Sequence, residues 1–346
     1  MSHPDYRVFR MSAHPVFAVP ANSRGARLAG ISRYQPISPK RAIYRSVMRM
    51  ATQTGLDRFL STRVQNPIVN YPDFGFAAWL ESIESKLNAG NLSAAIFWPP
   101  QIDRGRVYVH LLDTQHQPIA FAKISFNDSN DASLEKEANT LQALTASDLN
   151  SFKVPSVLDY QPASPNQHAV LVTQSIPTDA RPLAATLDSY PQECVREIAA
   201  ESTPVSTQGI ESCSWWPSYL NRRDTLDPCF VRELEQANTD KTQLCRSHGD
   251  FGIANMVQTP NSDLWIFDWE ECCQDAPILA DEISYFLGVH RPNTLPECES
   301  LFERFRAQFL DEKNPQRRID IMLALAFRST VNAPKADLII SRWNQF

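Results

Sequence analysis

Apolar side chains recur at helical spacing in the segment that follows residue 38. Ser38 is a favourable N-cap, Pro39 suits the first helical position and Gly55 is placed to end the helix, so the pattern predicts a helix between them. The two faces of this helix differ in chemistry. The apolar stripe consists of Ile43, Tyr44, Val47, Met48 and Ala51, and the basic face of Arg41, Arg45 and Arg49.

Two interpretations of this helix follow from its faces. We favour a helix that packs its apolar stripe on its own domain and leaves the basic face in water. The same pattern also occurs in surface helices that meet a membrane or an anionic partner. A second amphipathic helix is built on Phe76, Trp79, Leu80, Ile83 and Leu87. Residues 1–37 are rich in Pro, Arg and Ser and have little periodicity, so we expect an extended arm there.

From residue 93 the pattern changes to that of β-strands. Residues 94–98, 106–112 and 119–126 are β-prone and are joined by turn-forming segments, which predicts an antiparallel meander. Two more strands are expected at residues 154–160 and 168–174, which gives about five strands in this part of the chain.

Two charged residues stand out in the strand region. Lys123 interrupts the apolar run of the third strand, and Glu137 lies beside the apolar face of a helix predicted over residues 133–144. A carboxylate on the core side of a helix needs a partner, and Lys123 is the nearest candidate in sequence. The alternatives are a solvent-facing lysine and an exposed glutamate at the margin of the apolar stripe.

Beyond residue 177 the strand pattern stops. Residues 178–245 are expected to be mainly helical, and helices are predicted over residues 281–287 and 299–346. An aromatic cluster formed by Trp215, Trp216, Tyr219 and Leu220 could line a ligand pocket, but large aromatic side chains more often fill cores. The seven cysteines form no Cys-x-x-Cys pair and include the adjacent Cys272 and Cys273, which indicates free thiols.

A hairpin is predicted between residues 255 and 268, because two β-prone runs flank the turn formers Pro260 to Asp263. A four-residue loop would pair Thr259 with Leu264, and counting back along both strands then places Asn255 opposite Asp268. Asp250 lies just upstream, beside Gly249. Carboxylate and amide oxygens gathered in this way suit a hard cation such as Mg2+ that also binds substrate phosphates.

Length and charge narrow the class of protein. A chain of 346 residues can form two or more domains, and its net charge of −6 argues against nucleic acid as the main partner. No apolar run approaches the roughly 20 residues that span a bilayer, so no transmembrane segment is expected. The N-terminus has no signal-peptide pattern, which predicts a cytoplasmic protein.

The sequence Ser247-His248-Gly249-Asp250, followed by Asn255 and by Asp268-Trp269-Glu270, resembles the aminoglycoside phosphotransferase and choline kinase family. In that family the catalytic loop has the sequence His-Gly-Asp-x-x-x-x-Asn. The resemblance covers residues 91–290. It implies an α+β, two-lobed protein-kinase-like fold with a small antiparallel β lobe and a larger helical lobe.

The resemblance also implies a domain order. Residues 1–90 would be an N-terminal extension made of the arm and two helices. Residues 91–176 would form the nucleotide-binding β lobe with one helix. Residues 177–346 would form the helical lobe, which holds the catalytic loop and the acceptor site.

For the motif residues the resemblance implies individual roles. Asp250 would accept or orient the proton of the attacking hydroxyl, and Asn255 and Asp268 would hold Mg2+ against the β- and γ-phosphates. Lys123 would contact the α- and β-phosphates, with Glu137 fixing its ammonium group by an ion pair.

Further roles are implied for residues around this core. Gln174, Ser175 and Ile176 occupy the connector whose backbone would meet the adenine of ATP. His248 would brace the catalytic loop rather than react. Asp281 would support the same loop, although a plain helix cap is an equal alternative.

One departure from the kinase pattern concerns the loop from Pro99 to Gly105, which has a single glycine where phosphates would be covered. It leaves GTP, weak nucleotide binding or an inactive kinase fold open. Our leading hypothesis is an ATP- and Mg2+-dependent phosphotransferase that acts on a hydroxyl of a sugar, an amino alcohol or an aminoglycoside-like molecule. The alternative is a catalytically inactive kinase-fold binding or scaffold protein. Protein kinase activity is disfavoured, because Asp268-Trp269-Glu270 replaces Asp-Phe-Gly.

Overall fold

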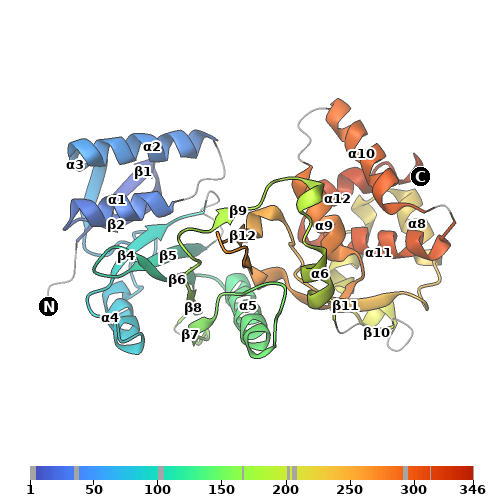
Figure 1. The fold of residues 1–346 in the computed structure, drawn as a ribbon, viewed down its shortest axis with the longest axis horizontal. Helices are drawn as coiled ribbons and strands as arrows, with labels where there is room; N and C mark the ends of the chain where they lie inside the picture. Colours follow the sequence, from blue (N-terminus) through green and yellow to red (C-terminus); the bar gives the residue numbers. More distant parts are fainter. Residues whose placement is uncertain are drawn as a thin grey trace. The chain divides into compact units, whose positions relative to one another are not determined.

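The computed structural model describes residues 5–34, 39–99, 105–165, 167–200, 203–204, 209–290, 295–311 and 313–345 (Figure 1). The chain divides into two compact units. Unit 1 consists of Met1–Gln142 with Pro155–Thr178, and unit 2 of Ala143–Val154 with Asp179–Phe346. The three ranges implied by the resemblance stay predictions.

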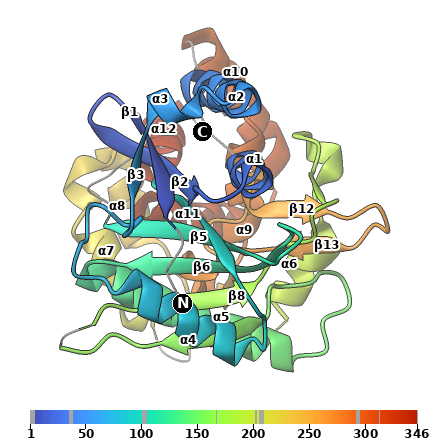
Figure 2. The same ribbon diagram turned by 90° about the vertical axis from the view of Figure 1, so that its left-hand side faces the viewer.

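Unit 1 is built on one eight-stranded sheet, in which neighbouring strands are antiparallel (Figure 2). The strands, in sheet order, are β3 (Ser61–Val64), β1 (Tyr6–Met11), β2 (His14–Pro20), β4 (Ser93–Phe97), β5 (Arg106–Leu112), β6 (Pro118–Ser125), β8 (Val170–Gln174) and β7 (Val157–Gln161). The predicted meander is confirmed as β4, β5 and β6. The two later strands are confirmed as β7 and β8.

The prediction of an extended arm over residues 1–37 is wrong for the residues that the structure describes. β1 and β2 form a hairpin that extends the sheet, and α1 (Arg24–Arg33) follows, capped by the Ser23 hydroxyl, which accepts from the Ala26 amide at 3.0 Å. Phe17, Ala18 and Val19 of β2 are all buried. A strand that is covered on both faces shows no alternation of apolar and polar residues, so the sequence pattern did not predict a strand here.

Helices pack on both faces of this sheet. α4 (Phe76–Lys86) buries Phe76, Trp79, Leu80 and Ile83 in the core that covers one face, as its predicted stripe required. On the other face, Ile31 of α1 packs with residues of β2 and β4. α5 (Asp128–Ala146) begins five residues before the predicted start, because the Asn127 side chain accepts from the Asn130 amide at 2.9 Å and caps it.

The predicted helix after residue 38 is confirmed as α2 (Pro39–Thr54), and Gly55 ends it with a φ of 79°. Its N-cap, Ser38, lies outside the described residues. α3 (Asp57–Leu60) follows directly. The orientation of α2 differs from the one we favoured: Met48 and Ala51 are buried, whereas Ile43 and Val47 are exposed.

Unit 2 is mostly helical. Its helices are α6 (Gln192–Ile198), α7 (Trp216–Leu220), α8 (Pro228–Gln236), α9 (Ala280–Val289), α10 (Leu295–Phe309), α11 (Pro315–Val331) and α12 (Ala333–Ile340). Its core gathers around α11, which packs against α7, α8, α9 and α12. Trp215, Trp216 and Tyr219 are buried in this core, as expected, whereas Leu220 is exposed.

Short strands also occur in unit 2, so the expectation of a mainly helical segment over residues 178–245 needs correction. β10 (Thr203–Pro204), β11 (Gln243–Ser247) and β14 (Cys273–Pro277) form one sheet. β9 (Arg181–Pro182), β12 (Met256–Gln258) and β13 (Leu264–Ile266) form another. β9, β10 and β11 have two to five residues, too few for their alternation to be recognised, whereas β12 and β13 are the two strands of the predicted hairpin. All seven cysteines are free, as predicted.

The sheet of unit 1 and the helices of unit 2 confirm the predicted α+β fold with a β lobe and a helical lobe. Among the described helices, none combines the length and the apolar character that crossing a membrane requires.

Candidate active site

In unit 1, Lys123 and Glu137 meet as an ion pair. The Lys123 ammonium lies 2.8 Å and 2.7 Å from the two carboxylate oxygens of Glu137, and both side chains are buried. β6 supplies the lysine and α5 the glutamate. A buried pair of this kind survives only where each charge neutralises the other, so the two alternatives of a solvent-facing lysine and an exposed glutamate are wrong.

In unit 2, the loop from Ser247 to Asn255 joins β11 to β12 and is anchored by Asp281 of α9. The Asp281 carboxylate accepts from the Ser247 hydroxyl at 2.7 Å, from the His248 amide at 2.8 Å and from the Gly249 amide at 3.2 Å. Asp281 is itself buried. Two successive backbone amides just before Asp250 are thereby bonded to α9.

The backbone at Gly249 requires glycine. Its φ is 84°, a left-handed conformation that L side chains rarely adopt, and a Cβ at this position would collide with the carbonyl oxygen of Glu271. The His-Gly-Asp order is therefore dictated by space as well as by chemistry.

His248 points into the interior. Its Nε2 lies 3.0 Å from the Phe267 carbonyl, to which it donates, and its ring packs on Trp269 with 4.5 Å between centroids. Burial lowers the pKa of His248 despite the nearby Asp281 carboxylate, so the ring is neutral in the folded protein. These contacts link the loop to the segment that carries Asp268, and they support a structural role for His248.

The buried His248 makes stability depend on pH. Because its pKa in the folded protein lies below its ordinary value of 6.5, the unfolded chain binds more protons as pH falls below about 6.5. We expect the free energy of unfolding to fall there, by at most ~1.4 kcal/mol per pH unit from this group. Burial raises the pKa of Asp281, which acts in the opposite direction.

Comparison with a His248→Gln variant isolates the histidine, because glutamine can still donate to the Phe267 carbonyl but does not titrate. Urea denaturation between pH 7.5 and 5.5 is the measurement. We expect the wild type to lose more stability than the variant over this range. Parallel losses in the two proteins would contradict a neutral, buried His248.

Asp250 is held on two sides. Its side chain is 44% exposed, which leaves the carboxylate accessible. The side-chain Nδ2 of Asn255 donates to the backbone carbonyl of Asp250 at 2.9 Å and lies 3.4 Å from the Asp250 carboxylate. The carbonyl oxygen of the Asn255 side chain makes no hydrogen bond within the described residues. It is therefore available as an oxygen ligand for a cation, and the donor set fits Mg2+.

The register of the hairpin differs by one residue from the prediction. Gln258, not Thr259, pairs with Leu264, and Asn255 therefore lies opposite Phe267, whose amide donates to the Asn255 carbonyl at 3.1 Å. The loop is shorter than expected, because the Thr259 amide donates to the Asp263 carbonyl at 3.0 Å and Ser262 adopts a left-handed φ of 69°. Such a three-residue loop ends in a left-handed residue.

Asp268 follows the paired part of the hairpin. Its own φ of 69° ends the strand, and the backbone continues into a 3-10 turn at Trp269. The segment before it is fixed, because the Phe267 carbonyl accepts from His248. The predicted pairing of Asn255 with Asp268 is thus wrong. The two residues are nevertheless tied to the same loop, through Phe267.

Arg328 is a residue of this site that the sequence analysis missed. It lies on α11, is 2% exposed, and donates to the Gly249 carbonyl and, at 3.3 Å, to the Asp250 carboxylate. Burial lowers the pKa of its guanidinium, and the nearby Asp250 opposes this shift. The available signal was a single arginine that directly follows the apolar run from Ile321 to Phe327.

The connector residues lie at the end of β8. The Gln174 amide donates to the Ser156 carbonyl at 2.8 Å, and the Ser175 amide lies 3.4 Å from the Ile119 carbonyl. Ile176 is partly buried. The glycine-poor loop is outside the described residues from Pro100 to Arg104. At its end, the Gly105 carbonyl accepts from the Asn130 side chain at 3.1 Å.

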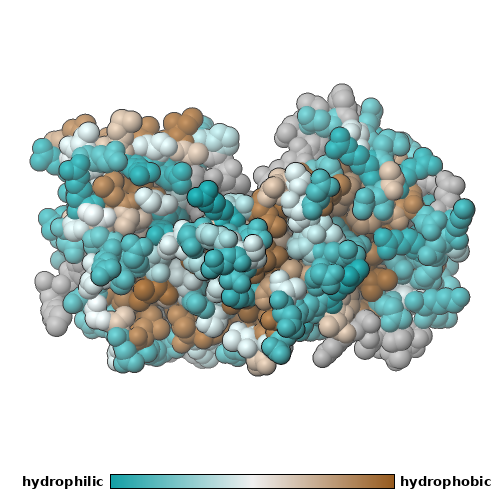
Figure 3. All heavy atoms as spheres, viewed as in Figure 1, coloured by the Kyte–Doolittle hydropathy of each residue, from teal (hydrophilic) through white to brown (hydrophobic). Residues whose placement is uncertain are grey.

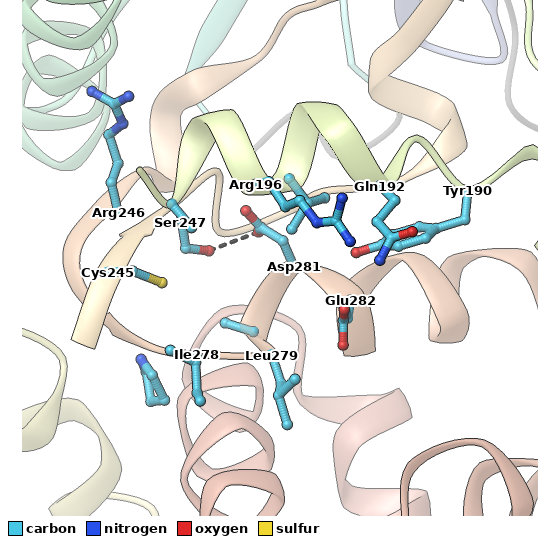
Figure 4. Close-up of a pocket in the computed structure, with 14 residues that line it drawn as sticks. Tyr190, Gln192, Arg196, Cys245, Arg246, Ser247, Ile278, Leu279, Asp281 and Glu282 are labelled. Carbon is cyan, nitrogen blue, oxygen red and sulfur yellow. Dashed lines mark hydrogen bonds between the residues drawn. The ribbon is translucent and has the colours of Figure 1, made fainter. Parts of the chain in front are cut away.

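A cavity of about 180 Å³ borders the anchor of the loop (Figure 4). Tyr190, Arg196, Cys245 and Glu282 line it, and Asp281 reaches across to Ser247 at its edge. Burial raises the pKa of the Cys245 thiol to about 12, so this thiol stays protonated and is no nucleophile. The cavity therefore offers no thiol nucleophile, and it lies beside the Asp281–Ser247 contact that anchors the loop.

Asp128, Asp131 and His168 of unit 1 could also be taken for cation ligands, since their ligand atoms lie within 4.8 Å of one another. The two Asp131 oxygens are already engaged, by His168 Nδ1 at 2.8 Å and by the Ala169 amide at 2.7 Å. These hydrogen bonds join α5 to the segment that leads into β8.

No protein-family model matches the sequence, and no curated protein matches it either. Among solved structures, the chain is similar to choline kinase LicA from Streptococcus pneumoniae, with 13% identity, a TM-score of 0.40 and coverage of 78% of this chain and 96% of that one. A LicA structure in complex with AMP gives 14% identity, a TM-score of 0.44 and coverage of 75% and 89%.

The spectinomycin phosphotransferase APH(9)-Ia, solved with ADP and spectinomycin, gives 15% identity and a TM-score of 0.41, over 78% of this chain and 98% of that one. At such identities the likeness concerns the backbone alone, so the roles of side chains depend on the contacts within this chain. The solved structures named here, to which this chain is similar, are thus a choline kinase and a spectinomycin phosphotransferase.

Proposed function

We propose that this protein transfers the γ-phosphate of ATP to a hydroxyl group of a small molecule. The observation that carries the proposal is the setting of Asp250. An accessible carboxylate is held between Arg328 and Asn255, on a loop whose amides Asp281 fixes. Phosphoryl transfer consists mostly of positioning and charge neutralisation, which a rigid loop of this kind supplies.

The proposed roles follow from the contacts of each residue. Asp250 accepts or orients the proton of the attacking hydroxyl, because it is the accessible carboxylate of the loop. Asn255 and Asp268 hold Mg2+, which neutralises charge on the β- and γ-phosphates when it is bound. The side-chain NH2 group of Asn255 faces Asp250. The side-chain oxygen of Asn255 therefore faces away from Asp250 and suits the cation.

For the nucleotide we assign Lys123 to the α- and β-phosphates. Glu137 holds the ammonium group in one place through two contacts, so the charge is preorganised. The backbone of Gln174, Ser175 and Ile176 would receive the adenine, and GTP remains an alternative nucleotide. His248 and Asp281 support the loop and take no part in the chemistry.

The acceptor is proposed to be a sugar, an amino alcohol or an aminoglycoside-like molecule. A screen of these three classes with Mg-ATP, read out as ADP formation and as mass of the phosphorylated product, is the test. We expect one class to give a phosphate ester. If no class gives product and Mg-ATP does not bind, the proposal is wrong. Nucleotide or acceptor binding without turnover would instead point to an inactive kinase-fold binding protein.

Arg328 gives a specific expectation for this activity. An Arg328→Met variant loses the donor that fixes Asp250 and the Gly249 carbonyl, so Asp250 becomes free to leave its reactive position. We expect kcat to fall about a hundredfold, since small displacements of a reacting group cost about this much, while KM for ATP stays within about twofold.

The matched control is Arg318→Met, on the same helix. Arg318 bonds Glu233 and stacks on Trp343 with 4.6 Å to the ring centroid, so its loss should affect stability and not kcat. Steady-state kinetics on both variants, at matched folded fraction, make the comparison. Equal kcat values for the two variants would show that Arg328 does not position Asp250.

A further inference from the structure

Exposed apolar side chains are concentrated on two short elements of unit 1. Of nine large apolar residues that are exposed in the described chain, six lie on or beside α2 and α3, and we name them the α2–α3 surface: Ile43, Val47, Met50, Leu56, Phe59 and Leu60. Ile43, Met50 and Phe59 are 66%, 65% and 71% exposed. Figure 3 shows hydrophobic side chains along the edge that α2 occupies at the upper left of Figure 1.

Polar contacts fix the orientation of α2, so the exposure is built into the fold. Arg41 donates to the Tyr34 hydroxyl at 3.1 Å, Arg45 to the Tyr34 carbonyl at 2.8 Å, and the Tyr44 hydroxyl to the Arg10 carbonyl at 2.7 Å. These residues share the inner face with the buried Met48 and Ala51. The part of the apolar stripe that remains therefore points outward at helical spacing.

The N-terminal segment that carries α2 and α3 is strongly basic. Residues 6–72 contain eleven lysines and arginines and a single carboxylate, Asp57, in a chain whose net charge is −6. Asp57 is buried and lies 2.9 Å from Arg27 and 3.7 Å from Arg7, so it is already neutralised. The segment therefore has an excess of positive charge, and its one carboxylate is not at the surface.

Basic side chains flank the apolar ones. Lys40, Arg49 and Arg58 are exposed and make no ion pair within the described residues. On the helical wheel of α2, Lys40 adjoins the stripe made by Ile43, Val47 and Met50, and Arg49 lies on its other side, about 100° beyond Met50. Apolar side chains bordered by basic ones, without an exposed carboxylate among residues 39–60, match a surface that is apolar below and anionic at its boundary.

We propose that the α2–α3 surface docks on a membrane that contains anionic phospholipids. The six apolar side chains enter the boundary between headgroups and acyl chains, and Lys40, Arg49 and Arg58 reach the lipid phosphates. A second copy of the chain fits this surface less well. In a two-fold symmetric contact the same patch faces itself, which would bring the basic side chains together. The inference does not depend on the proposed activity.

Flotation of the full-length protein with lipid vesicles tests the inference. We expect binding to vesicles that contain about a third of phosphatidylglycerol, weak binding to phosphatidylcholine alone, and release at about 1 M salt, where charges are screened within a few ångströms. A Val47→Ser/Phe59→Ser variant removes apolar contact, and Arg49→Glu/Arg58→Glu reverses the charge. Each is expected to weaken binding about tenfold or more.

Leu220→Ser is the matched control, because Leu220 is an exposed leucine of unit 2 and should leave vesicle binding unchanged. Circular dichroism confirms that every variant is folded. The inference is overturned if the wild type floats with neither vesicle, or if the α2–α3 variants bind as well as the control. It is also overturned if sedimentation shows a wild-type dimer that Val47→Ser/Phe59→Ser dissociates, since a second copy would then be the occupant.

Discussion

Replacing Asp250 by asparagine is expected to lower kcat for phosphoryl transfer by about 10²- to 10⁴-fold, the range that a positioned general base contributes. Asparagine has the same size and can still accept from Arg328, so the loop keeps its shape. Because Asp250 is the ion-pair partner of the buried Arg328, removing its charge also lowers stability, so kcat is compared at matched folded fraction. The affinity for Mg-ATP should remain within about twofold, since Asp250 is assigned to the acceptor hydroxyl.

Asp263→Asn is a suitable control for this variant. Asp263 lies in the hairpin that follows the loop of Asp250 and pairs with Lys153 at 3.0 Å, at an exposed position that has no role in the proposed chemistry. We expect it to keep the wild-type kcat. If Asp250→Asn and Asp263→Asn had the same kcat, Asp250 would not be the base. That result would favour the interpretation as a binding or scaffold protein.

The second large effect is expected at the ion pair of Lys123 and Glu137. Lys123→Met leaves a buried carboxylate without its partner, and Glu137→Leu leaves a buried ammonium, so each should lower the free energy of unfolding by about 3–5 kcal/mol. Replacing both residues together by Met and Leu removes both charges. We expect the double variant to recover most of the lost stability, since apolar pairs often replace buried ion pairs without cost.

Nucleotide binding separates the two roles of this pair. The double variant should be folded and yet lack Mg-ATP affinity, because no ammonium group remains for the α- and β-phosphates. Urea denaturation gives the coupling energy between the two sites, and calorimetry with Mg-ATP gives the affinity. A folded double variant that binds Mg-ATP like the wild type would remove Lys123 from the proposed site.

Local motifs made part of this site predictable. Asp250 and Asn255 are five residues apart, and this short separation in sequence limits the distance between them in space. Lys123 and Glu137 were linked by a different argument, namely that a carboxylate on the core side of a helix needs a partner. Arg328 could not be found in this way. It reaches Asp250 from 78 residues further along the chain, and only the packing of α11 brings the two together.

The errors have equally specific causes. One left-handed residue, Ser262, shortened the hairpin loop and shifted the register by one, which moved Asp268 away from the position opposite Asn255. For α2, periodicity identified the helix but did not settle which part of its stripe is buried. Hydrogen bonds of Arg41 and Arg45 to Tyr34 settle it, and tertiary contacts of that kind leave no trace in a hydrophobic pattern.

The most direct test of the proposed function follows the γ-phosphate itself. The wild type and Asp250→Asn are incubated with Mg2+ and ATP labelled with oxygen-18 in its γ-phosphate, in the presence of the acceptor found by the screen. We expect the wild type to form a phosphate ester. Its three non-bridging oxygens should carry the label, and its bridging oxygen should come from the acceptor. Label found only in inorganic phosphate, or equal ester formation by Asp250→Asn, would contradict this expectation.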